Sequence, residues 1–151
     1  MKFNVKRFTY EWSAPFDFEL NGSGTVDDPY LIEIVETHHY DIKEHNITLS
    51  NSLDYIKFNR INIRVLHLIN SANISISNAK LRNLILENCS KISINNSIMT
   101  KRLRLSDATQ INISNCQIEN LSALSGDQIL ILDSNVKNIS KNSKANIQFQ
   151  E

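Results

Sequence analysis

Apolar residues in the second half of the chain occur in pairs two positions apart, and the pairs recur about every 18 residues. Each repeat opens with an isoleucine, and these isoleucines are Ile56, Ile74, Ile92, Ile111, Ile129 and Ile147. A second and a third pair follow at steps of five residues, as Ile61/Ile63 and Leu66/Leu68 do in the first repeat. Side chains two positions apart lie on one face of a β-strand, so each repeat predicts three short strands with a shared apolar face.

This repeat is incompatible with helices and with hairpins. Helices need apolar residues three and four apart, and the repeats contain no Asn-Gly or Asp-Gly turn for two-residue hairpins. The remaining arrangement is a solenoid, in which equivalent strands of successive coils pair in parallel and like side chains stack in columns. The predicted fold class is therefore all-β, a single-stranded parallel β-helix with about 18 residues and three short strands per coil.

Asparagines recur at matching offsets just after the predicted strands, where the coil must turn a corner. These corner positions are Asn78, Asn96, Asn115 and Asp133 after the first strand, Asn83, Asn120 and Asn138 after the second, and Asn51, Asn70, Asn88 and Asp107 after the third. Tight corners need positive φ angles, which asparagine tolerates better than other residues except glycine. Stacked amide side chains can also form a hydrogen-bonded ladder along the axis.

The chain resembles right-handed parallel β-helix proteins of the pectate-lyase-like and NosD-like group in residues 73–99, NISISNAKLRNLILENCSKISINNSIM. It is also similar, in residues 22–34, to the segment GSGTVDDPYLIEI that often opens such domains. The resemblance implies a right-handed helix over roughly residues 21–149. The coils are shorter and poorer in glycine than is usual in that group. Their inward spacing also resembles pentapeptide-repeat solenoids, which remain a second fold hypothesis.

The first half of the chain is less regular and begins with an aromatic segment. Its aromatic residues are Phe3, Phe8, Tyr10, Trp12, Phe16 and Phe18. An open end of a solenoid is an edge strand that must be covered. We therefore divide the chain into an N-terminal aromatic cap, residues 1–24, and a parallel β-helix, residues 25–151. The alternative is an aromatic surface that binds a partner or a sugar.

The composition is that of an ordinary globular domain. Hydrophobic residues make up 41% and charged residues 21% of the 151 residues, and 16 basic residues balance 16 acidic ones. No apolar run is long enough for a transmembrane helix, and none follows the basic residues near the N-terminus as in a secretory signal. We expect a chain without a membrane span.

Cysteines and histidines offer little chemistry. Cys89 and Cys116 fall at inward positions on different faces, so we expect two buried free thiols, which suit the reducing cytoplasm. His38 and His39 would point to opposite sides of a strand, and His45 would reach them only if the local loop folded back. His67 lies at a position of the repeat that points outward, so we expect its side chain to be solvated. We predict no metal site and no cofactor.

Carboxylates decide whether an enzyme of the pectate-lyase-like kind is to be expected, because such enzymes act through acidic clusters on one outer face. The acids of the repeats, Glu87, Asp107, Glu119, Asp127 and Asp133, form no column. No catalytic residue is predicted. If the chain were an enzyme, the place to look would be the acidic N-terminal part, with Asp27, Asp28, Glu33, Glu36, Asp41 and Glu44.

Charge segregates along the chain although the total is zero. Residues 1–55 hold 4 basic and 10 acidic residues. Residues 56–105 hold 9 basic residues and 1 acidic residue, and residues 106–151 hold 3 basic and 5 acidic residues. A basic belt is predicted on the second face, made of Arg64, Lys80, Arg82, Lys101 and Arg102, the last two at a one-residue insertion. Such a belt is either a solvated face or a site for an acidic partner.

A second candidate surface is apolar. Ile69 and Ile85 are predicted to be diagonal neighbours on the outside of the third face. Lys141 and Lys144 fall where inward residues are expected, which predicts a frayed strand in the last coil. Paired outward apolar residues suggest contact with another protein or another copy of the chain.

These observations predict a non-catalytic scaffold or protein-interaction module, with a protein partner or another copy of the chain, as in a homo-oligomer, as what it binds. One alternative is carbohydrate binding or polysaccharide processing, implied by the resemblance alone. The other is polyanion binding through the basic belt. Among polyanions, a nucleic acid is the less favoured ligand, because no aromatic side chains interleave with these charges.

Overall fold

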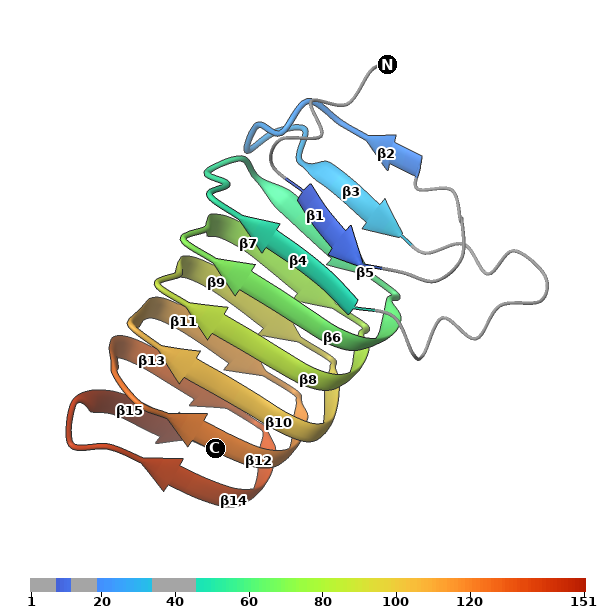
Figure 1. Ribbon diagram of the computed structural model, residues 1–151. Helices are drawn as coiled ribbons and strands as arrows, with labels where there is room; N and C mark the ends of the chain where they lie inside the picture. Colours follow the sequence, from blue (N-terminus) through green and yellow to red (C-terminus); the bar gives the residue numbers. More distant parts are fainter. Residues whose placement is uncertain (1–7, 12–18, 34–45) are drawn as a thin grey trace.

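The computed structural model describes residues 8–11, 19–33 and 46–151, which form a parallel β-solenoid of about six turns (Figure 1). Sheet A runs in the order β1 (Phe8–Glu11), β4 (Asn46–Ser50), β6 (Asn62–Ile69), β8 (Lys80–Glu87), β10 (Ile98–Ser106), β12 (Gln117–Ala123) and β14 (Asn135–Lys141). Sheet B runs in the order β2 (Glu19–Asn21), β3 (Tyr30–Glu33), β5 (Ile56–Asn59), β7 (Ala72–Ser77), β9 (Ser90–Asn95), β11 (Ala108–Ser114), β13 (Gly126–Leu132) and β15 (Ala145–Gln150). The all-β class and the 18-residue coil are thus confirmed.

Each coil has two strands, one in each sheet, because the second and third predicted strands are parts of one bent strand. In β8, for example, Leu81 and Leu84 are buried, whereas Arg82 and Asn83 between them both face outward. Two consecutive outward residues turn the strand through the predicted corner without interrupting it. The second and third faces therefore form one continuous surface.

The core consists of inward columns that run through the coils. Ile76, Ile94 and Ile113 lie in register on β7, β9 and β11, and each is 0% exposed. Leu66, Leu84 and Leu103 form the equivalent column of sheet A. Burying a side chain of this size contributes about 1.5–3 kcal/mol, so the columns account for most of the stabilisation of the stack.

Asparagine holds the corners between the sheets, as predicted. Positive φ angles occur at Asn51, Asn70, Asn78, Asn88, Asn96, Asn115, Asp107 and Asp133. The amide of Asn88 donates to Oδ1 of Asn70 at 2.8 Å, and that of Asn70 donates to Oδ1 of Asn51 at 3.1 Å. The predicted positive φ at Asn83, Asn120 and Asn138 is wrong, because these residues lie at the bend inside a strand.

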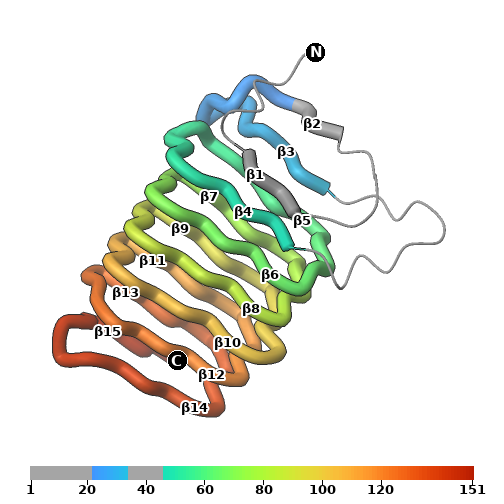
Figure 2. The backbone as a smooth tube through the Cα atoms, viewed as in Figure 1, coloured from blue at the N-terminus to red at the C-terminus, as the bar shows by residue number. Residues whose placement is uncertain are grey.

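The two ends of the solenoid differ. At the first coil, β1 pairs antiparallel with β4 and β2 pairs antiparallel with β3, so described strands of the N-terminal segment extend both sheets. The predicted packing of the aromatic cap lies outside the described side chains. At the last coil, β14 continues through Lys141, so the predicted fraying is wrong there; Lys144 lies in the following turn. The tube in Figure 2 shows the coils stacked in one direction from β4 and β5 to β14 and β15.

Candidate partner-binding face

Six cationic side chains lie on the outer surface of β6, β8 and β10. They are the predicted Arg64, Lys80, Arg82, Lys101 and Arg102, together with Arg104, and we call this surface the basic face. Lys80, Arg82, Lys101 and Arg102 are exposed, whereas Arg64 and Arg104 are half-buried. Sheet A therefore carries six of the nine cations of residues 56–105.

The register stacks like charges on one another. Ile63 pairs with Leu81 and Val65 with Asn83, which places Arg64 directly beside Arg82. Neighbouring strands lie about 4.8 Å apart, and like charges in directly opposed positions destabilise a sheet. The basic face therefore concentrates positive charge along the axis of the solenoid.

A β-bulge widens this face at β10. Met99 pairs with Leu81 but Arg102 pairs with Asn83, so Thr100 and Lys101 both lie opposite Arg82. The predicted one-residue insertion is thus a bulge in sheet A. Nδ2 of Asn120 donates to the carbonyl of Lys101 at 2.7 Å, which satisfies a backbone group that the bulge removes from the ladder.

Few of these cations have a polar partner. Nε of Arg64 donates to Oδ1 of Asn46 at 3.0 Å, but among the described residues no ion pair involves any cation of the basic face. The same surface shows that pairing is possible where an acid is present, since Nζ of Lys137 lies 2.7 Å from Oε2 of Glu119. Glu119 lies opposite the bulge on β12 and Glu87 lies diagonal to Arg104, yet no cation of the basic face is paired with an acid among the described residues.

Apolar residues border the cations on the same surface. Ile85 pairs in register with Arg104, and Ile69, diagonal to Ile85, pairs with Glu87; both isoleucines are half-buried. Ile98 lies beside Lys80 and is 38% exposed. The predicted diagonal placement is confirmed. Sequence reasoning missed Arg104 because it treated the second and third faces separately; the outward offset that Arg104 shares with Ile85 was the available signal.

A shallow depression of about 170 Å³ adjoins the bulge. Its lining residues are Ile98, Met99, Thr100, Gln117, Ile118, Glu119, Asn135 and Lys137. The depression has room for one aliphatic side chain next to the cations.

The described residues hold no group of three or more His, Cys, Asp or Glu side chains that could bind a metal. His38, His39, His45, Glu36, Asp41 and Glu44 lie outside the described residues. Glu33 accepts a hydrogen bond from Asn59 Nδ2. His67 is outward as predicted but not fully solvated, since its Nε2 lies 3.3 Å from Oε2 of Glu87 on the next coil.

Both cysteines are buried and free, as predicted. Burial raises the pKa of the Cys89 and Cys116 thiols above their ordinary value of 9.0. Sγ of Cys116 donates a hydrogen bond to the carbonyl of Ser114 at 3.1 Å. In the same column, the hydroxyl groups of Ser97 and Ser134 each donate a hydrogen bond to the carbonyl two residues earlier in the chain. The thiols therefore pack the corner columns and lack the exposed, acidic character of a nucleophile.

Nowhere in the described part of the chain is there a helix with the length and hydrophobicity that crossing a bilayer requires. No protein-family model, no curated protein and no solved structure matches this chain.

Proposed function

We propose that this chain is a non-catalytic β-solenoid scaffold that binds an acidic protein partner through the basic face. The observation that supports the proposal is a group of six outward cations on three neighbouring strands, none of which forms an ion pair among the described residues, on a sheet where Lys137 and Glu119 do pair. Carboxylates lying across the rungs would remove the repulsion and form charge-assisted hydrogen bonds with the guanidinium groups.

A polypeptide fits this face better than a nucleic acid or a glycan does. Bases and sugars are commonly bound by stacking on Phe, Tyr or Trp, and β6, β8 and β10 contain none of these residues. The apolar residues that border the cations are instead the isoleucines Ile69, Ile85 and Ile98. Aliphatic side chains beside cations suit a partner that offers both carboxylates and aliphatic side chains.

The carbohydrate alternative is supported only by the resemblance to pectate-lyase-like and NosD-like proteins. Polygalacturonate and a single-stranded oligonucleotide therefore belong in the same experiment as competitors. Tighter binding of either one than of an acidic peptide would contradict the proposal of a protein partner.

The test is a titration of a fluorescein-labelled peptide of alternating Glu and Leu into the protein. The double variant Arg82→Glu/Arg102→Glu should weaken binding at least about tenfold, equivalent to about 1.4 kcal/mol. The control Lys57→Glu/Lys144→Glu makes the same change of net charge at exposed positions away from sheet A, and should change the affinity about twofold at most. Equal losses in the two variants would reduce the effect to net charge and overturn the proposal.

A further inference from the structure

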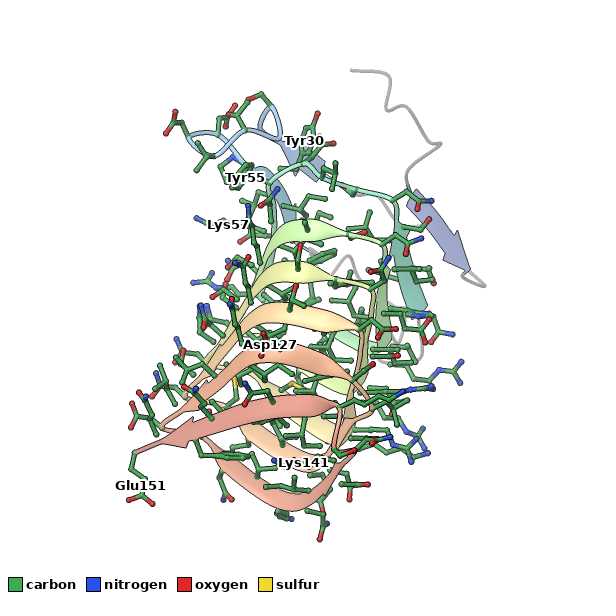
Figure 3. All side chains as sticks on the ribbon, turned by 90° about the vertical axis from the view of Figure 1, so that its left-hand side faces the viewer. Tyr30, Tyr55, Lys57, Asp127, Lys141 and Glu151 are labelled. Atoms are coloured by element: carbon green, nitrogen blue, oxygen red, sulfur yellow. The ribbon has the colours of Figure 1, made fainter. Side chains whose placement is uncertain are left out.

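A second surface of the molecule has the opposite charge and a similar apolar content. The loops of residues 22–29 and 51–55 lie together at the end of the solenoid near β3. There they expose Val26 at 64%, Leu53 at 72% and Tyr55 at 38%. Asp27 and Asp28 are exposed beside Val26. We call these five residues the acidic knob. Figure 3 shows Tyr30 and Tyr55 close together, at the opposite end of the molecule from Lys141 and Glu151.

The loop that carries the knob is tightly wound. The amides of Ser23, Gly24 and Thr25 all donate to the carbonyl of Asp28, at 3.0, 2.9 and 3.2 Å. Oγ1 of Thr25 accepts from the amide of Asp28 at 3.2 Å. Oγ of Ser23 also donates to the carbonyl of Asp28 at 3.3 Å, so the loop is fixed from within by several hydrogen bonds to one residue.

Two glycines and one backbone hydrogen bond hold this loop against its neighbours. Gly22 has φ +111°, and a Cβ there would lie 2.2 Å from the Pro29 carbonyl oxygen; a Cβ at Gly24 would enter the ring of Tyr30. The amide of Tyr55 donates to the carbonyl of Gly24 at 2.9 Å, which ties the two loops together. A surface held in this way loses little conformational entropy when it binds.

We infer that the acidic knob of one molecule docks on the basic face of a second copy. The inference rests on the proposed function, because it identifies the acidic partner as this same chain. The knob offers two carboxylates and three apolar side chains, and the face offers six cations bordered by Ile98 and the depression beside it. Within one molecule, no ion pair among the described residues joins Asp27 or Asp28 to the face.

The contact would be head-to-tail, because the knob and the face are different surfaces. Each copy presents both, so association adds copies in sequence and forms an open chain or a closed ring. Opposite charges steer such an encounter, and salt screens it over about 8–10 Å.

A charge-swap experiment tests the inference by sedimentation velocity over a concentration series at low ionic strength. The wild-type mass should rise with concentration. The knob variant Asp27→Lys/Asp28→Lys and the face variant Arg82→Glu/Arg102→Glu should each associate less than the wild type. The knob variant then opposes like charges, and the face variant lowers the charge of the face from six cations to four cations and two carboxylates. An equimolar mixture of the two should associate again, since the unchanged face of the knob variant still fits the unchanged knob of the face variant.

Two controls keep this experiment decisive. Lys91→Glu/Lys144→Glu changes two exposed cations outside both surfaces and should associate like the wild type, and Val26→Ser should weaken association without a change of charge. A wild type that stays monomeric to millimolar concentration overturns the inference, as does a mixture that fails to associate or an association that neither variant reduces. In each case retained, face-dependent binding of the Glu-Leu peptide would leave the proposed function standing, so the two failures are distinguishable.

Discussion

Sheets A and B have the same inner surface and different outer surfaces. Inward, both present unbroken columns of buried Ile and Leu. Outward, the middle of sheet B carries short neutral side chains, which are Ser75, Ser93 and Asn112 in one column and Ser77, Asn95 and Ser114 in the next. Sheet A carries the cations at the equivalent coils.

The insertion separates the two sheets further. The coil that begins at Ile92 has 19 residues, yet β9, β11 and β13 keep their register along Ile92, Ile111 and Ile129. The extra residue is absorbed by the bulge in β10 of sheet A. Since inward side chains specify the coil and outward ones do not, the outer surface of sheet A could diverge without loss of the fold.

The largest loss of stability is expected from Ile94→Asp, which places a charge at an inward position. Ile94 is 0% exposed between Ile76 and Ile113, and an unpaired carboxylate there would cost several kcal/mol, much of a typical stability of about 5–15 kcal/mol. We expect an unfolded chain by circular dichroism. Its neighbour Ser93→Asp faces outward and should shift the free energy of unfolding by about 0.5 kcal/mol or less. Equal destabilisation of the two variants would refute the register.

The period of two residues explains how much of the fold could be predicted. Alternation fixes which side chains point inward, and the recurrence of Ile74, Ile92 and Ile111 fixes which coils they join. The same pattern cannot tell a sharp corner from a bend, so the continuity of β8 through Arg82 and Asn83 was not predictable. Nor were the positive φ angles at Lys91, Gln110 and Gln128, because those residue types do not signal this conformation.

The candidate sites were predictable to different extents. The basic face follows from the repeat, which places Arg64 beside Arg82 before any coordinates are known. The acidic knob lies outside the repeat. Its exposed Val26 and Leu53 depend on how two irregular loops meet, through the bond from Tyr55 to Gly24.

The corners join the two sheets, and Asn88→Ala tests what holds them. Asn88 has φ +51° and donates to Asn70. Alanine would lose that bond and retain the strained φ, for a loss of about 2 kcal/mol in urea unfolding. Asn88→Gly loses the bond but relieves the strain, so the loss should be below about 1 kcal/mol. Equal losses would show that the φ angle contributes nothing.

The buried thiols belong to the inner surface and make its stability depend on pH. Because burial raises the pKa of Cys116 in the folded state, the neutral thiol favours folding below the ordinary value of 9.0, and that contribution is lost as the pH rises above it. At pH 7.5 the variant Cys116→Ser should match the wild type within about 1 kcal/mol, since Ser97 and Ser134 hold equivalent positions in the column. Between pH 7.5 and 10 its free energy of unfolding should fall less than that of the wild type. Parallel decreases would mean that Cys116 does not titrate with unfolding.

The smallest expected effect is on the melting temperature, and it compares a charge change on the outer surface of sheet A with one on the outer surface of sheet B. Arg82→Glu replaces a repelling neighbour of Arg64 with an attracting one, so at low salt the melting temperature should rise by about 1 °C. Ser93→Lys on sheet B lies in register between Ser75 and Asn112, which carry no charge, and should change the melting temperature less than Arg82→Glu does. High salt should abolish the rise in Arg82→Glu, because both side chains are near solvent and their interaction is screened. A rise that persists in high salt would come from packing, and a fall would show that Arg82 stabilises the free protein. In that case the cations of sheet A would not destabilise the free protein, and their repulsion would no longer support the proposal of an acidic partner.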